Sequence, residues 1–258
     1  MFALDPYDAL VPVYLETDIP RRIAQTGTAV FVEVHGEPFL FTAAHVTDDR
    51  ERGELLVPTN RGLSPIEGYV GYVDLLPETR RSEDDVDIAY YRLSSEFARH
   101  LCHHFLPLAR QRCELISPTL EPMACSASGY PASKSRKTAD GAYTSEVFSF
   151  RGVSAAPDAY EKWNLSTDIN IVLHFNKKSA VDPATLKSFP TPSLRGISGG
   201  GIFAWPKGQE ISDDWSLPKL VGLVHSFKEK EGLIIGTTLL PILSAIQLGR
   251  MKGYGGVR

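Results

Sequence analysis

Cysteine is scarce in this sequence, and its scarcity bears on the redox environment of the protein. The 258 residues include three cysteines, Cys102, Cys113 and Cys125, an odd number without a close pair. Small secreted domains that depend on disulfides carry more cysteines, in even numbers and at short spacings. The sequence therefore predicts reduced thiols, which are typical of a cytoplasmic protein.

Long apolar runs and a strong net charge are also lacking. No stretch approaches the roughly 20 apolar residues of a membrane span, and the first residues lack the basic and then apolar segments of a secretory leader. The net charge of -4 and the pI near 6.0 give no overall positive field that would attract a phosphate backbone. We therefore expect a cytoplasmic protein that uses neither a membrane nor a nucleic acid as its main partner.

Short strand-like segments dominate what the sequence does contain. Hydrophobic residues make up 43% of the chain and charged residues 22%, as in a globular protein. No regular alternation of strands with long helices is visible, so we expect a mainly β fold built from antiparallel sheets. Helical spacing is seen in residues 94–105 and 240–248. Strands are predicted for residues 28–34, 38–42, 54–57, 68–73, 88–93, 124–129, 147–153, 169–175, 201–205, 220–226 and 233–238.

Three regions are expected along the chain. Residues 1–26 mix apolar, charged and proline residues, which leaves a short helix and an extended arm both open. Residues 107–119 carry prolines and arginines with little periodicity, as a boundary between two units would. We therefore divide the chain into an N-terminal arm or helix (1–26), a first β unit (27–110) and a second β unit with a C-terminal helix (111–258).

A histidine and an aspartate stand at the ends of two predicted strands. The apolar strand that ends at Thr42 is followed by two alanines and then His45, so small neighbours leave the imidazole accessible. A general base needs such a rigid and open position, although a single histidine after a strand is more often structural. Asp87 directly precedes another apolar strand, where a partly buried carboxylate can accept the Nδ1 proton of a histidine.

Two further carboxylates, Asp84 and Asp85, lie just before Asp87. Aspartates in a polar turn are commonly solvated. We interpret Asp84 and Asp85 as a solvated acidic turn without a role in chemistry.

A serine lies in a glycine-rich segment immediately before a predicted strand. The segment 195–201 reads Arg-Gly-Ile-Ser-Gly-Gly-Gly, with Ser198 between glycines. Glycines permit unusual dihedral angles and a close approach of the backbone, so the N–H groups of Gly196 and Ser198 are candidates for an oxyanion hole. Flexible turns and phosphate-binding nests have a similar composition, but the lysine of a phosphate-binding P-loop is absent.

Taken together, these segments resemble a known family. Segments 42–45 (Thr-Ala-Ala-His), 87–89 (Asp-Ile-Ala) and 196–200 (Gly-Ile-Ser-Gly-Gly) are similar, in order and setting, to the three signatures of trypsin-like serine peptidases of the bacterial intracellular type. The resemblance implies two antiparallel six-stranded β-barrels of the chymotrypsin fold and a C-terminal helix. It implies a serine endopeptidase without a cofactor or metal, in which Ser198 attacks the peptide carbonyl, His45 transfers the proton and Asp87 orients His45. Gly196 and Ser198 would bind the oxyanion.

Several residues depart from the pattern of the secreted members of the family. Ile197 stands where zymogen-activated relatives carry an aspartate that pairs with a new N-terminus, so the resemblance excludes activation by that ion pair. Val46 and Leu194 replace half-cystines, which agrees with a reducing compartment. Gly201 replaces a proline and loosens the turn after the serine. Control by an activating partner remains open.

The resemblance also implies a substrate pocket for a protein or peptide. Pro192, six residues before Ser198, stands where cleavage after Lys or Arg would require an acidic residue, so a basic P1 residue is not favoured. Phe227, on the strand that lines the cleft, is expected to narrow the site toward small or medium apolar side chains. The residues assigned to the pocket are Pro192, Ser193, Arg195, His225, Ser226 and Phe227.

Two alternatives remain open. His100, Cys102, His103, His104 and Cys113 form a group of metal-capable side chains, but they lack the tight Cys-x-x-Cys pairing of a structural zinc site, so we expect no metal. The chain is also consistent with a catalytically silent barrel that binds a partner. For the active enzyme we expect limited cleavage of a specific protein, with stress or phage defence as the setting by analogy alone.

Overall fold

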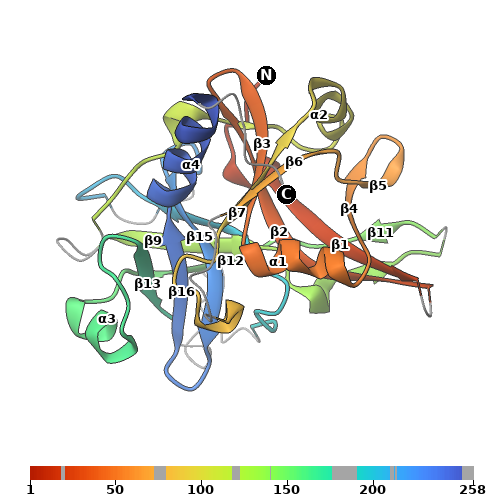
Figure 1. Ribbon diagram of the computed structural model, residues 1–258. Coiled ribbons are helices and arrows are strands. Elements are labelled where there is room, and N and C mark those ends of the chain that lie inside the picture. Colours follow the sequence, from red (N-terminus) through yellow and green to blue (C-terminus); the bar gives the residue numbers. More distant parts are fainter. Residues whose placement is uncertain are drawn as a thin grey trace.

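The structure is a computed structural model of the 258-residue chain (Figure 1). It describes residues 1–18, 21–72, 80–117, 123–139, 141–175, 191–209, 212 and 214–251. Two curled, mainly antiparallel sheets make up the molecule, and Figure 1 shows the red-to-yellow strands of the first sheet beside the green-to-blue strands of the second. The mainly β fold predicted from the sequence is confirmed.

The first sheet has the strand order β5-β4-β1-β2-β3-β7-β6, with the short β8 paired parallel to β2. Seven strands thus form the main order, where the sequence predicted six. Val73, predicted in the strand that begins at Gly68, lies outside the described residues. The strands are β1 (Leu10–Asp18), β2 (Arg21–Val34), β3 (Glu37–Thr42), β4 (Glu54–Thr59), β5 (Gly62–Pro65), β6 (Gly68–Tyr72), β7 (Ala89–Leu93) and β8 (Leu108–Ala109).

The second sheet has six strands in the order β12-β9-β14-β15-β16-β13. A two-stranded hairpin of β10 (Arg136–Lys137) and β11 (Tyr143–Thr144) lies outside it. Each neighbouring pair is antiparallel. The strands are β9 (Ala124–Gly129), β12 (Phe148–Val153), β13 (Asn170–His174), β14 (Gly201–Ala204), β15 (Lys219–Lys228) and β16 (Leu233–Thr238).

Helices are short and lie outside the sheets. They are α1 (Ala44–Asp48), α2 (Ser95–Leu101), α3 (Pro157–Trp163) and α4 (Leu240–Met251). Ser94 caps α2 by accepting the N–H of Phe97 at 3.1 Å, and α4 is the predicted C-terminal helix. Single 3₁₀ turns occur at Pro6–Ala9, Asp49–Glu51, Arg81–Glu83, Arg110–Arg112 and Ala132–Lys134. In the described part of the chain, no helix has the length and apolar character that crossing a membrane requires.

Strand β2 is buried on both faces, because the two faces meet different cores. Successive side chains of a strand point to opposite sides. Ala29 and Phe31 face the interior of the first sheet, whereas Val30 and Val32 face a cluster shared with the second sheet and α4. A third cluster fills the interior of the second sheet. The two sheets are therefore joined by an apolar core of their own.

The N-terminal region differs from the sequence prediction. Residues 1–26 were expected as a separate arm or helix, but Leu10–Asp18 form β1, which pairs with β2 and β4. Apolar side chains on both faces of β1, including Val11 and Tyr14, are fully buried. Burial of this apolar surface favours insertion of the segment into the sheet over an exposed arm.

Candidate active site

His45 and Asp87 are brought together by the pairing of β3 with β7. In that pair Thr42, the last residue of β3, lies opposite Ala89, the first residue of β7. Asp87 lies two residues before this start of β7, and His45 follows the end of β3 by three residues, in the first turn of α1. The register of one antiparallel pair therefore places both side chains at the same edge of the first sheet.

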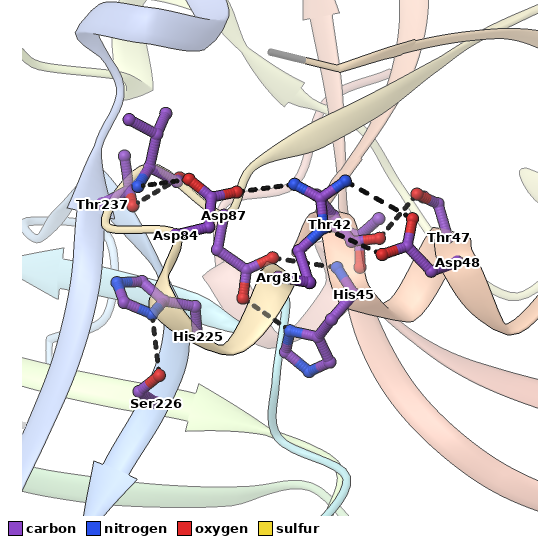
Figure 2. Close-up of polar contacts among 12 residues, drawn as sticks. Thr42, His45, Thr47, Asp48, Arg81, Asp84, Asp87, His225, Ser226 and Thr237 are labelled. Carbon is purple, nitrogen blue, oxygen red and sulfur yellow. Dashed lines mark hydrogen bonds and ion pairs between the residues drawn. The ribbon is translucent and has the colours of Figure 1, made fainter. Parts of the chain in front are cut away.

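Asp87 accepts two hydrogen bonds from His45. The His45 backbone N–H donates to Oδ1 at 2.8 Å, and the ring nitrogen Nδ1 lies 2.6 Å from Oδ2 (Figure 2). An ionised carboxylate has no proton to donate, so Nδ1 carries the hydrogen and Nε2 has a free lone pair. Ala43, the residue before α1, makes no side-chain cap, so the Asp87 carboxylate also caps the helix.

Opposing effects set the pKa values of this pair. Burial of the His45 ring opposes its charge, but the hydrogen bond and charge of Asp87, with Asp49 and Asp48, outweigh burial and raise the pKa of His45. Burial likewise acts to raise the pKa of Asp87, and the contact with His45 outweighs it, so that this pKa is lowered. A buried carboxylate that stays ionised stabilises the imidazolium form of its partner.

A second histidine, His225, lies beside the pair. Strand β15 shifts register between Val224 and Ser226, so His225 is the extra residue of a bulge, a feature that redirects a side chain. Its ring is 8% exposed, and Nδ1 lies 2.9 Å from the Ser226 hydroxyl. Its Nε2 is buried and has no hydrogen-bond partner within the described parts of the chain. Burial, the largest influence, lowers the pKa of His225 to about 4, so this ring is neutral near pH 7.

The loop that carries Ser198 is tied to both sheets. The Ser198 carbonyl accepts the Thr28 N–H of β2 at 2.8 Å, and the Gly199 N–H donates to the Val224 carbonyl of β15 at 2.7 Å. Gly199 has φ +81°, and a Cβ there would lie 2.1 Å from the Thr28 carbonyl oxygen and 2.9 Å from the Ala43 nitrogen. Only glycine permits this approach. The loop thus lies against Ala43, the residue that follows β3 and precedes His45 by two.

The Ser198 hydroxyl and the His45 ring are not hydrogen-bonded to each other, and both belong to the described residues. The structure therefore brings His45 and Asp87 into contact and the Ser198 loop against the same strand end. In substrate-free hydrolases, a contact between nucleophile and base is often long and shortens when substrate binds.

Within the described residues, the two backbone N–H groups predicted for an oxyanion hole, those of Gly196 and Ser198, have no internal hydrogen-bond partner. The Arg195 carbonyl accepts the Ala132 N–H at 2.8 Å, so the Gly196 N–H of the same trans peptide points the opposite way. The Ile197 carbonyl similarly accepts the Gly200 N–H at 2.8 Å, which turns the Ser198 N–H outward. Within the described residues, no hydrogen bond uses either N–H group.

A pocket of about 180 Å³ lies next to Ser198. Four of the residues predicted for a substrate pocket line it, namely Pro192, Ser193, Arg195 and Phe227. Leu194 and Glu229 also belong to the described lining. His225 and Ser226, predicted for the same pocket, are not among the described residues of its lining. The pocket therefore carries both an acidic and a basic side chain at an apolar wall.

The comparisons with known proteins add the fold. No family model matches the chain, and no curated protein matches it. Among solved structures, the chain is similar to the thermostable serine protease AL20 from an extremophilic microorganism, at 15% identity and a TM-score of 0.51, over 90% of this chain and 91% of that one. The serine protease domain of the Sesbania mosaic virus polyprotein matches at 13% identity and a TM-score of 0.49, over 92% and 91%. The chain therefore has the predicted chymotrypsin-like fold, with two curled antiparallel sheets and a C-terminal helix.

Within this chymotrypsin-like fold, Arg81 forms a charged network with Asp84 and Asp48 that was not predicted from the sequence. Asp84, interpreted as part of a solvated turn, has a side chain only 11% exposed and pairs with Arg81 at 2.6 Å. Arg81 also pairs with Asp48 of α1 at 2.8 Å. No sequence pattern indicates these contacts, because Asp48 lies far from Arg81 along the chain and all three residues occur in charged stretches.

The group of metal-capable side chains near α2 is dispersed. His100 Nδ1 lies 2.9 Å from Asn60 Oδ1, and His104 Nε2 lies 3.1 Å from the Thr59 carbonyl. Cys102 is exposed and Cys113 is buried. In the described part of the chain, no three His, Cys, Asp or Glu side chains gather as ligands of a metal ion.

Proposed function

We propose that this chain is a serine endopeptidase that hydrolyses peptide bonds through Ser198, His45 and Asp87. The observation that carries the proposal is the pair of hydrogen bonds from His45 to the buried Asp87 carboxylate, at 2.8 and 2.6 Å. Next to this pair lies a loop with a serine and two N–H groups that have no hydrogen-bond partner among the described residues. This arrangement supplies a base with a fixed tautomer, a nucleophile and donors for an oxyanion.

The proposed reaction has two halves. Ser198 Oγ attacks the carbonyl carbon while its proton passes to His45 Nε2, and the N–H groups of Gly196 and Ser198 donate to the oxyanion. His45 then protonates the leaving amine as the C–N bond breaks, which leaves an acyl-enzyme. A water molecule gives a proton to His45 and attacks the acyl group, and the returning proton restores Ser198. Asp87 stabilises the imidazolium in both halves, and no cofactor is required.

The segment before Ser198 has an anchor other than an ion pair. Ile197 is 2% exposed and packs in the core of the second sheet, at the position where the family resemblance places an activating aspartate. Burial of this apolar side chain stabilises the loop without a newly formed N-terminus. We infer that no proteolytic activation is needed, and that any control comes from an activating partner.

The proposed substrate is a specific protein, cut at few sites. Pro192 and Phe227 in the pocket lining support a small or medium apolar P1 residue, and Ser193 and Arg195 line the same pocket. The bacterial cytoplasmic location and the role in stress or phage defence stay predictions, because no described residue bears on them.

Labelling with a fluorophosphonate tests the proposal, since this probe reacts with an activated serine. We expect the wild-type chain to be labelled and Ser198→Ala to lose all labelling, while the exposed Ser216→Ala keeps it. His45→Ala should lower the rate of peptide hydrolysis by about 10³-fold or more. A wild-type chain that is neither labelled nor active, alone and with cell extract, contradicts the proposal and favours the silent binding module. Activity of the isolated chain that extract does not increase argues against an activating partner.

A further inference from the structure

Arg81 joins the two chain segments that carry His45 and Asp87. Its Nε donates to Asp48 Oδ2 at 2.8 Å, and its Nη1 donates to Asp84 Oδ2 at 2.6 Å. Asp48 ends α1, three residues after His45, and Asp84 lies three residues before Asp87. Figure 2 shows the Arg81 guanidinium between the carboxylates of Asp84 and Asp48, above the contact of His45 with Asp87 in this view.

The Arg81–Asp84 pair is better shielded than an ordinary surface ion pair. The Arg81 side chain is 18% exposed and that of Asp84 is 11% exposed, whereas that of Asp48 is 43% exposed. Exposed ion pairs contribute little, because water and salt screen them, whereas a partly buried guanidinium with two carboxylate partners also fixes geometry. Arg81 therefore links Asp48 and Asp84 in a fixed geometry.

Both linked segments depend on such contacts for their position. Helix α1 has five residues, too few for stability on its own, and Asp87 caps its first turn while Arg81 holds its last residue. The segment before Asp87 is fixed on its other side, where Thr237 Oγ1 of β16 donates to the Val86 carbonyl at 2.7 Å. Without Arg81, the Asp87–His45 contact alone would have to hold this segment against α1, while Thr237 keeps it attached to the second sheet.

We propose that Arg81 is a positioning residue of the active site, a clamp that holds α1 against the segment 84–87 and so fixes the contact between His45 and Asp87. Arg81 acts through these residues and does not touch substrate. The inference rests on the proposed peptidase function for its kinetic consequences. Its structural consequence, the state of His45, is measurable without catalysis.

Arg81 also balances charge around His45. The charged and titratable groups nearest to His45 are Asp48 and Asp49 beside its helix, Arg81, Asp84 and Asp87 from the facing segment, and His225 from β15. Because Asp48 raises the pKa of His45, loss of the cation that neutralises Asp48 should raise this pKa further.

Substitution of Arg81 separates its two contributions. We expect Arg81→Met to lower kcat by about 10- to 100-fold per active site, because misplacement of a base by about 1 Å costs that much, with KM within about twofold of wild type. The acid limb of the pH profile should move to higher pH. Arg81→Lys keeps the charge but not the fork, so we expect a reduced kcat with the acid limb near its wild-type position.

Arg52→Met is the matched control, because Arg52 pairs with Asp49 at 2.8 Å just after α1 and, among the described residues, makes no link to the Asp87 segment. We expect Arg52→Met to keep kcat within about twofold of wild type. Titration of active sites corrects every rate for the folded fraction. A wild-type kcat and pH profile in Arg81→Met would overturn the inference, as would a loss that disappears after this correction.

NMR titration of the His45 ring distinguishes this inference from the proposed function. It is performed in the Ser198→Ala background, where no self-cleavage occurs. A weakened or lost downfield signal of the Nδ1 proton in Arg81→Met supports the clamp, even if the wild-type chain proves to have no peptidase activity, because this proton lies in the His45–Asp87 contact. A downfield signal unchanged from that of Ser198→Ala alone overturns it, whatever the activity of the wild type.

Discussion

Phe227 forms one wall of the pocket beside Ser198, and its position is fixed by other aromatic side chains. Its ring centroid lies 5.7 Å from that of Phe175, which lies 4.5 Å from Phe150. Phe148 continues the row at 4.5 Å from Phe150. A ring braced in this way cannot easily move aside for a large substrate side chain. At the scale of single residues, Phe227 therefore limits the width of the proposed P1 site.

Phe227→Ala should widen the P1 preference of the proposed peptidase. We expect the ratio of kcat/KM for a P1 phenylalanine substrate to that for P1 valine to rise by about tenfold or more, because pocket contacts are worth this much per large group. A ratio within one variant does not depend on its folded fraction. Phe148→Ala is the control, since it shortens the aromatic row at the far end from Ser198. An unchanged ratio, or a wild-type peptide-library profile dominated by Lys or Arg at P1, contradicts the pocket assignment.

The residues of the site differ in how much of their role the sequence could predict. The approach of His45 to Asp87 follows from two strand ends that are visible as patterns and that pair in one register. The link through Arg81 could not be predicted, since a charged residue in a polar stretch is expected to be solvated unless its partners are known. His225 is similar, because a bulge in β15 turns its ring toward Asp87 and no period-two pattern indicates a bulge.

Strand β2 is the element that connects the first sheet to the loop of Ser198. Thr28 Oγ1 donates to the Gly196 carbonyl and accepts the Tyr130 N–H, each at 2.9 Å, and the Thr28 side chain is fully buried. The Thr42 hydroxyl donates to the Thr28 carbonyl at 2.7 Å. Thr28 of β2 therefore holds together the loop at Gly196, the residue that follows β9 and the end of β3.

Thr28→Val should weaken this junction between elements. Valine fills the same space but leaves the Tyr130 N–H and the Gly196 carbonyl without their partner, at a cost of about 1–3 kcal/mol in the free energy of unfolding. We also expect the rate of fluorophosphonate labelling to fall by about tenfold, because the Gly196 peptide loses its anchor. Urea unfolding and labelling kinetics measure the two effects. Thr28→Ser keeps the hydroxyl, so equal losses in Thr28→Ser and Thr28→Val would contradict the role of the hydrogen bonds.

Strands were predictable where a short apolar run is bounded by turn residues, and β1, in which proline and charged residues occur, was not. All eleven predicted segments coincide with strands, because most are short apolar runs rich in β-branched and aromatic residues and bounded by turn residues. Strand β1 was missed, since Pro12 and the charged residues at its far end conceal a run that is buried on both faces. Its place in the sheet depends on pairing with β2 and β4, which is tertiary information.

On the scale of the whole molecule, the junction between the two sheets combines an apolar core with a few buried polar groups. Val30 and Phe39 of the first sheet share a cluster with Phe203 and Leu223 of the second, and Ile246 of α4 packs on it. His225 of β15 lies at this junction, beside Asp87. A charge that forms on His225 would therefore be buried between the two sheets.

The burial of His225 predicts that the folded molecule loses stability in mild acid. Its pKa is about 4 when folded, against an ordinary value of 6.5, so the unfolded chain takes up a proton first as the pH falls. The free energy of unfolding should then decrease between pH 6.5 and about 4, by up to about 1.4 kcal/mol per pH unit. The raised pKa of His45 contributes a constant stabilisation below pH 6.5, and the lowered pKa of Asp87 acts only below 3.8, so neither masks this window.

Urea unfolding at pH 7 and pH 4.5 tests this prediction. The difference in the free energy of unfolding between the two pH values should be smaller for His225→Gln than for the wild type, while the exposed His103→Gln keeps the wild-type difference. An equal difference in all three proteins would mean that His225 is not buried in its neutral form at the junction, and that the two sheets meet in another way.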